Sequence, residues 1–102
     1  MTSKLAIFEG KEIRKLWYKE EWWFVIEDII VVLTDSSDPK QYINKMKERD
    51  EQLSQGWVQI VHTLPVDTPG GKQKMNCTNT EGAFRIIQSI PSPKAEPFKL
   101  WL

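Results

Sequence analysis

Side chains able to do covalent or metal chemistry are scarce in this chain. Its 102 residues include one cysteine, Cys77, and one histidine, His62. A structural zinc site takes four ligands, drawn mostly from these two residue types, so we expect no such site. A single thiol also excludes an internal disulfide framework, and a buried structural role suits Cys77 better than a catalytic one.

Carboxylates form the remaining candidates for acid–base chemistry. They occur in three clusters: Glu20-Glu21, Asp35 with Asp38, and Glu48 with Asp50 and Glu51. All three fall in predicted turns or on a solvated helix face, without a neighbouring base or an apolar pocket. Gly70-Gly71 is a turn pair and lacks the spacing of a nucleotide-binding loop. We therefore expect no enzyme and no cofactor.

Basic side chains near aromatic rings could instead contact phosphates and stack on bases. The candidates are Arg14 and Lys15 near Trp17, Lys72 and Lys74 on a predicted hairpin, and Arg85 and Lys94 around a helical corner. The chain has fourteen basic and fourteen acidic residues, so its net charge is zero. A dedicated nucleic-acid binder usually carries a basic excess, so binding would have to depend on a local patch. Residues 57–102 form the most basic part of the chain.

Periodicity predicts the elements that position these residues. Three strand-like pieces, residues 5–8, 12–19 and 22–26, are separated by turn signals and predict a small antiparallel meander. The β-branched run within residues 27–34 has strand propensity. Its leading acids, Glu27 and Asp28, suit the first turn of a helix, so this pattern alone leaves both types open.

The middle of the chain is predicted to hold a helix and a long hairpin. Asp38 and Pro39 suit the cap and first residue of a helix that runs to about residue 53. Its outer face carries mixed charges, which favours a solvated surface over a binding surface. We expect Gly56 to end this segment. Residues 57–64 are then predicted as a strand, 65–72 as a loop and 72–77 as the returning strand.

The last stretch, residues 76–102, predicts two short helices that meet at a proline-rich corner. Thr78 or Asn79 caps the first helix, and Thr78 has capping-box spacing to Glu81. Ser92 and Pro93 begin the second. Phe98 and Trp101 share one face of that helix, and Leu102 borders them. This stripe either folds back on the core of the domain or forms a two-fold interface with a second copy.

Four stretches of sequence carry a family resemblance. They are WWFVIEDIIVVLTDS, DPKQYINKMKERD, GGKQKMNCTNTEG and NTEGAFRIIQSIPSPKAEPFKLWL. In this order they resemble the Bro-N domain, which heads baculovirus-repeated-ORF proteins, many phage antirepressors and relatives such as DNA-damage-inducible protein D. The resemblance implies a short buried helix over residues 27–34, which we adopt. It also implies DNA binding, or action within a switch that relieves repression of lytic genes.

Together these patterns predict one α+β domain over residues 1–102, with a small antiparallel hairpin sheet packed against about four short helices. We expect a prophage antirepressor-like regulatory domain that binds DNA weakly, double- or single-stranded, through the six basic residues given above. The alternative is a protein-interaction module that contacts a repressor or forms a homodimer through Phe98, Trp101 and Leu102. No signal peptide and no apolar run of about 18 residues is present, so we expect a cytoplasmic protein without a membrane partner.

Overall fold

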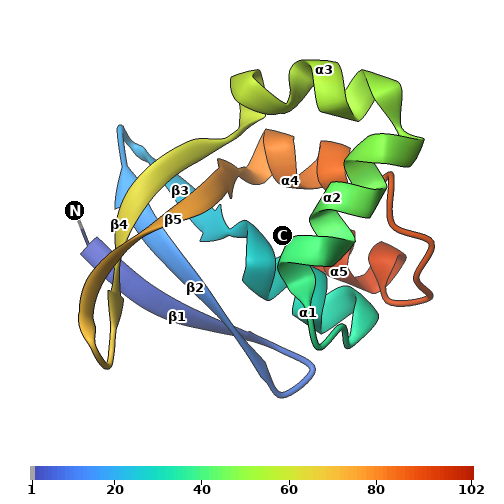
Figure 1. Cartoon of the computed structure of the whole chain (residues 1–102). Coiled ribbons are helices and arrows are strands. Elements are labelled where there is room, and N and C mark those ends of the chain that lie inside the picture. The colour runs from blue at the N-terminus through green and yellow to red at the C-terminus, as the bar shows by residue number, and fades with distance from the viewer. Residues whose placement is uncertain (1) are drawn as a thin grey trace.

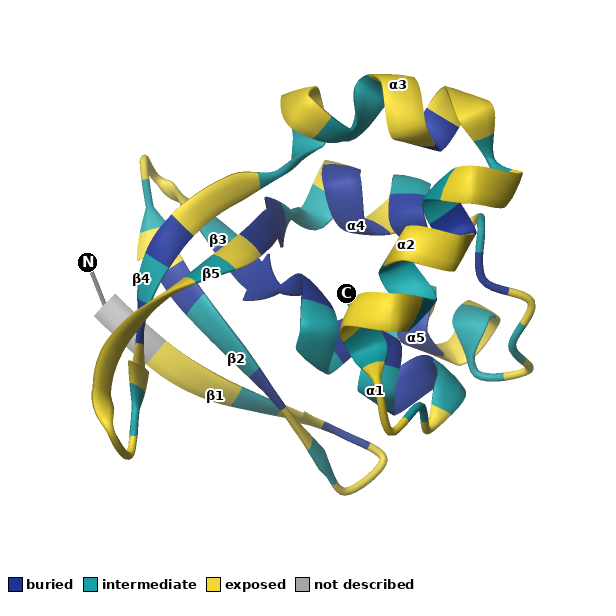
Figure 2. Ribbon diagram, viewed as in Figure 1, coloured by how far each residue is buried: buried dark blue, intermediate teal, exposed yellow. Residues whose placement is uncertain are grey.

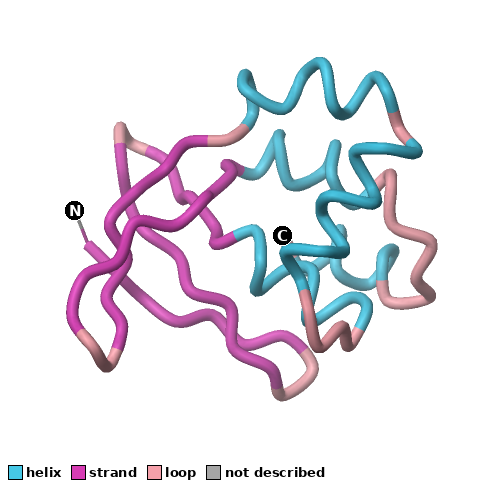
Figure 3. The backbone as a smooth tube through the Cα atoms, viewed as in Figure 1, coloured by secondary structure: helices cyan, strands magenta, loops and turns pink. Residues whose placement is uncertain are grey.

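The computed structural model describes the backbone of residues 2–102, with side chains from Lys4 onward. Five antiparallel strands form one sheet in the order β1-β2-β3-β5-β4, and five helices gather on one side of it (Figures 1 and 3). The elements are β1 (Thr2–Phe8), β2 (Lys11–Tyr18), β3 (Glu21–Val25), α1 (Ile26–Thr34), α2 (Pro39–Arg49), α3 (Glu51–Ile60), β4 (His62–Thr68), β5 (Gly71–Asn79), α4 (Thr80–Ile87) and α5 (Ala95–Trp101). The α+β class is confirmed, with five helices where about four were expected.

The first three strands form the predicted meander. Both of its turns contain two residues with positive φ, Glu9 and Gly10 in the first and Lys19 and Glu20 in the second. Two-residue turns of this kind match the right-handed twist of the strands that they join. Across β2 and β3, Trp17 lies opposite Trp22, with the ring centroids 5.2 Å apart.

The sheet buries apolar side chains on both faces, in two separate clusters, and Figure 2 marks the buried positions along its strands. One face packs against the helices and contributes Phe8, Ile13 and Phe24 to the main core. The other face curls around a smaller cluster: Leu16, Trp23, Val25, Leu64, Val66 and Cys77. Strands β1 and β4 are the two edges of this curled sheet, and they are not paired with each other.

Residues 27–34 form the helix that the resemblance implied, within α1. Propensity alone favours a strand here, yet Ile26, Ile29, Ile30, Val32 and Leu33 are all buried. Packing on almost every side of a short helix therefore outweighs the small preference of β-branched residues for strands.

The strand predicted over residues 57–64 is wrong in its first half. Asp50 ends α2 and caps a separate helix, α3, by accepting a hydrogen bond from the amide of Leu53 at 3.0 Å. That helix continues through Gly56 to Ile60, because Leu53, Trp57 and Ile60 form one stripe against the core. The loop predicted over residues 65–72 is also wrong, since β4 and β5 are joined by a tight turn at Pro69 and Gly70.

At the C-terminal end, Asn79 is the cap of α4, because its side chain accepts from the amide of Gly82 at 2.9 Å. The Thr78 hydroxyl instead donates to the carbonyl of Ile60 at 2.8 Å. Helix α5 begins at Ala95, two residues later than predicted. Ser92 ties the corner to α1 by donating to the carbonyl of Leu33 at 2.6 Å.

Candidate nucleic-acid interface

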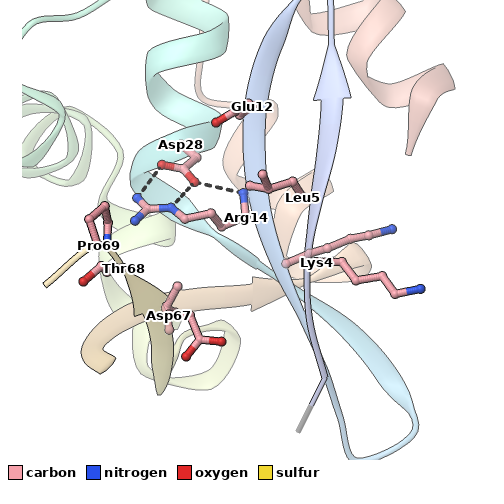
Figure 4. Close-up of a pocket in the computed structure, with 10 residues that line it drawn as sticks. Lys4, Leu5, Glu12, Arg14, Asp28, Asp67, Thr68 and Pro69 are labelled. Carbon is pink, nitrogen blue, oxygen red and sulfur yellow. Dashed lines mark hydrogen bonds and ion pairs between the residues drawn. The ribbon is translucent and has the colours of Figure 1, made fainter. Parts of the chain in front are cut away.

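Arg14 is held inside the domain by Asp28. Its Nε and Nη2 each donate to the carboxylate at 2.8 Å, and its backbone amide donates to the same group at 3.0 Å. These hydrogen bonds raise the pKa of the Arg14 guanidinium, against the opposing effect of burial. Figure 4 shows the pair bridging β2 and α1. Arg14 therefore fixes the first helix on the sheet, and its charge is balanced within the chain.

Three more of the six predicted basic residues also pair with carboxylates. Arg85 Nη2 lies 3.2 Å from Asp50, and Lys94 Nζ lies 3.4 Å from Asp35. Lys72 Nζ lies 2.9 Å from Asp67, in a pair that is largely exposed on the hairpin. An exposed pair is worth little, so Lys72 could exchange Asp67 for a phosphate more readily than Arg85 could leave Asp50.

Lys15 and Lys74 remain without an ion pair in the described part of the chain. The Nζ of Lys15 lies 4.2 Å from the ring centroid of Trp22. Lys15 on β2 is paired with another lysine, Lys4, on β1. Lys74 is exposed on β5, opposite Pro65. The structure therefore does not join the six predicted residues into one patch.

Helix α2 carries the largest group of cations on one element. Its basic residues are Lys40, Lys45, Lys47 and Arg49, against a single acid, Glu48. Within residues 4–102 none of the four forms an ion pair. Lys47 lies over the ring of Trp57 at 4.9 Å, and Arg49 lies over Tyr42 at 5.6 Å. Sequence reasoning took this face for solvated surface, although the four-to-one charge ratio over eleven residues was visible.

A cleft of about 750 Å³ opens between the first hairpin and the turn joining β4 to β5. Its lining residues are Lys4, Leu5, Glu12, Arg14, Lys15, Asp28, Val66, Asp67, Thr68 and Pro69. Figure 4 shows the Arg14–Asp28 pair inside this group and the Lys4 side chain extending away from it. Because its central charges neutralise one another, the cleft lacks the one-signed field that would concentrate a charged ligand.

Cys77 is a buried structural thiol. Burial raises its pKa to about 12, so it is protonated and poorly nucleophilic at neutral pH. Among the described residues no group of three or more His, Cys, Asp or Glu is placed to hold a metal ion. No helix in the described part of the chain is long and apolar enough to cross a membrane.

The predicted interface residues lie against the domain itself. Phe98 is fully buried, and its ring meets Phe8 edge-on with the centroids 5.0 Å apart. Trp101 is half-buried against Phe8 and Phe98, and Leu102 packs against the same core. The side chain of Phe98 is therefore inaccessible to a second copy of the chain. Trp101 and Leu102 are partly exposed and could still contact one.

Comparison with known proteins gives a family match over most of the chain. The model of the BRO family N-terminal domain, Bro-N, matches residues 12–102. An uncharacterized protein of Haemophilus influenzae is 30% identical over 84 residues, which cover 82% of this chain and 37% of that protein. The chain thus spans little more than a third of that relative. No solved structure matches. Since the family match extends from β2 to the last residue, this chain belongs to the Bro-N family, whose domains are of a regulatory, DNA-binding class rather than enzymes.

Proposed function

We propose that this chain is the DNA-binding domain of an antirepressor-like regulatory protein, and that α2 supplies its main contacts to phosphate. The supporting observation is the availability of charge. Lys40, Lys45 and Lys47 have no acidic partner within the described residues, whereas Arg14, Arg85 and Lys94 are paired inside the chain. Binding to a polyanion releases counterions in proportion to the cations that replace them, so unpaired cations contribute most.

The spacing of these lysines suits a phosphate backbone. Lys40 and Lys47 lie seven residues apart on one side of α2, or about 10 Å along the helix. Lys45 flanks the opposite side of the same exposed face. Three phosphate contacts give a slope of about −3 in a plot of log affinity against log salt. With a net charge of zero, the whole domain adds little further attraction, so the binding is weak and depends on this patch.

A pair of charge reversals tests the location. Lys40→Glu with Lys45→Glu changes the net charge by the same amount as Lys72→Glu with Lys74→Glu on the hairpin. Affinity for a labelled DNA duplex is measured by fluorescence anisotropy between about 50 and 200 mM salt. We expect the α2 variant to lose at least about tenfold in affinity and to flatten the salt slope by about 2. The hairpin variant should lose less, because Lys72 is already balanced by Asp67.

Three outcomes would contradict this proposal. Equal losses in both variants would mean that only net charge matters and that no patch is preferred. A larger loss in the hairpin variant would place the phosphate contacts on Lys72 and Lys74. Absence of binding by the native chain at low salt would remove the DNA-binding function.

Edge strand β1 favours a second candidate function, a protein-interaction module that contacts a repressor or a second copy. Leu5 and Ile7 are 56% and 62% exposed, and both lie on the face that borders the cleft. An edge strand with free backbone groups and exposed apolar side chains is a template for another strand. Of the apolar surface offered by the described residues, this edge is better placed for association than the half-buried Trp101.

Sedimentation at increasing concentration separates these surfaces. If the module self-associates through β1, the variant with Leu5→Lys and Ile7→Lys should have a lower average mass in solution than the native protein. The Trp101→Ala variant should have the same average mass as the native protein. If Trp101→Ala alone dissociates the assembly, the C-terminal helix is the interface. A native chain that stays monomeric at high concentration excludes self-association, and the β1 edge would then require a different protein as its partner.

A further inference from the structure

Helix α3 presents an exposed face of unusual composition. Its sequence, EQLSQGWVQI, contains one charged residue, Glu51, while the adjoining α2 contains five. Three of the six glutamines in the chain, Gln52, Gln55 and Gln59, lie on α3. All three are exposed, and Figure 2 shows that much of α3 is coloured as exposed. Their spacing of three and four residues places them along one side of the helix.

The neighbours on this ridge extend the same chemistry. Val58 is 81% exposed between Gln55 and Gln59, and Ser54 is exposed on the other flank. Only a narrow stripe of Leu53, Trp57 and Ile60 faces the core. The outer surface therefore offers glutamine and serine donors and acceptors beside one aliphatic side chain. Its one charged residue is Glu51, which accepts a hydrogen bond from the side-chain amide of Gln55 at 3.3 Å, so this face carries fewer charges than a typical solvated helix.

These side chains match the edges of base pairs in the major groove. A glutamine amide can donate and accept at once, which fits the N6 and N7 atoms of adenine, and an aliphatic side chain fits the methyl group of thymine. Ten helical residues span about 15 Å, and the major groove is about 12 Å wide, so the groove admits a helix of this size. A lysine-rich helix would instead bind phosphates without regard to sequence.

The end of α2 that carries Lys47 and Arg49 adjoins α3. One residue, Asp50, separates the two helices, and Lys47 of α2 reaches the ring of Trp57 on α3. Figure 1 shows α3 on the outside of the helical layer, with α2 leading into it. A phosphate strand held by α2 would thus run next to the groove in which α3 lies. The mainly uncharged face of α3 would lie in the groove, and the positive charge of α2 would lie at its wall.

We propose that α3 is the base-reading helix of this domain, recognising adenine–thymine pairs in the major groove of duplex DNA through Gln55, Val58 and Gln59. The inference rests on the proposed DNA-binding function and adds the element that gives sequence preference. It separates two roles within one surface, with α2 holding the backbone and α3 selecting the bases.

The test compares sequence preference with affinity. The native chain selects from a pool of duplexes with a randomised core, and binding to the selected duplex and to a scrambled duplex is measured at one salt concentration. Gln55→Ala with Gln59→Ala is the α3 variant, and Gln73→Ala with Gln88→Ala is the control, since these are exposed glutamines on other elements. Alanine favours helix, so the α3 variant should keep its fold, which circular dichroism checks.

We expect the native chain to enrich sequences with adenine–thymine pairs and to prefer them over the scrambled duplex. Each lost contact should lower that preference about five- to 150-fold. The α3 variant should therefore bind both duplexes alike, with unchanged affinity for the scrambled duplex and an unchanged salt slope. The control variant should keep the preference.

Three results would overturn the inference. A preference retained by the α3 variant would assign base reading to another element. A native chain that binds all duplexes equally, with a normal salt slope, would leave DNA binding in place but remove the reading role of α3. A native chain that binds no duplex at low salt would remove both.

Discussion

Asp50 stands at the end of α2 and joins α3 to α4 through its carboxylate. It caps α3 through the amide of Leu53, accepts from the hydroxyl of Ser89 and pairs with Arg85 of α4. The Ser89 hydrogen bond is the largest cause of a lowered Asp50 pKa, followed by the Leu53 amide. Burial opposes them, and Arg85 lowers the pKa further. The ionised form of Asp50 therefore stabilises the corner between α2 and α3.

The lowered pKa of Asp50 predicts a pH-dependent stability. A carboxyl whose folded-state pKa lies below its unfolded value stabilises the fold above that unfolded value, near 3.8 here, and loses this contribution as pH falls through the folded value. We expect Asp50→Asn to lower the free energy of unfolding at neutral pH. Because asparagine still caps a helix, the loss reports mainly on the charge.

Urea unfolding of the native chain and of Asp50→Asn, at neutral pH and near pH 3, measures this effect. The difference between the two proteins should shrink at the lower pH, because the stabilisation by the carboxylate decreases once the pH falls below the unfolded value of 3.8. A difference that is as large near pH 3 as at pH 7 would show that shape or hydrogen-bond geometry at residue 50, rather than charge, is responsible.

Ion pairing explains why the availability of each basic residue for binding was hard to predict from the sequence. Arg14 and Asp28 are 14 positions apart, Arg85 and Asp50 are 35 apart, and Lys94 and Asp35 are 59 apart. Sequence shows that a residue is basic, but the fold decides whether a carboxylate already balances its charge. The basic residues of α2 outnumber the single acid on that helix, Glu48, so their charge is not balanced within the helix.

At the scale of elements, two helical glycines have opposite roles. Gly82 sits where α4 meets the end of α3, and a Cβ built there would lie 2.0 Å from Thr78 Oγ1 and 3.1 Å from the carbonyl oxygen of Ile60. Those two atoms belong to the hydrogen bond that joins β5 to α3. Gly56, in the interior of α3, has nothing within 4 Å of the same position.

Alanine at these two positions should therefore change stability in opposite directions. Gly82→Ala forces the Thr78 hydroxyl or α4 to move and should cost about 1–3 kcal/mol, as overpacking does. Gly56→Ala adds helix propensity without a clash and should stabilise the domain by up to about 1 kcal/mol. The midpoint of denaturant unfolding measures both changes in stability, provided that the dependence of the unfolding free energy on denaturant concentration is the same in each protein. Destabilisation by Gly56→Ala, or tolerance of Gly82→Ala, would contradict the packing described for α3 and α4.

The same helix shows where sequence patterns stop predicting elements. The meander follows from local turn signals, and Asn79 was one of the two predicted caps of α4. Helix α1 was predicted only through the family resemblance, because its local pattern left both strand and helix open. Trp57, Val58, Ile60 and Val61 have strand propensity, and Gly56 suggests a stop, so the second half of α3 was predicted as a strand. Its first residues were predicted as the end of the preceding helix. Its helical state depends on the Asp50 cap and on a core that accepts Leu53, Trp57 and Ile60 on one stripe, which only the tertiary structure supplies.

At the scale of the whole molecule, the two candidate binding surfaces lie on different parts of the fold. Helix α3 lies outermost in the helical layer, while β1 forms the opposite edge of the sheet (Figure 1). A partner strand on β1 would not cover α2 or α3. The fold therefore allows a protein contact and a DNA contact at the same time, which suits a regulatory domain of a switch.

Helix α5 closes the main core, so the end of this chain contributes to the stability of the whole domain. Phe98 is fully buried against Phe8 of β1, whereas Leu100, two residues later, is 88% exposed. We expect Phe98→Ala to lower the free energy of unfolding by about 3–5 kcal/mol, because it leaves a cavity where the first strand and the last helix meet. Leu100→Ala should change it by less than about 0.5 kcal/mol. Urea unfolding measures both, and similar effects of the two substitutions would mean that α5 is not docked as described. Since a domain of this size is usually stable by only about 5–15 kcal/mol, the loss of Phe98 would remove much of the margin on which both binding surfaces depend.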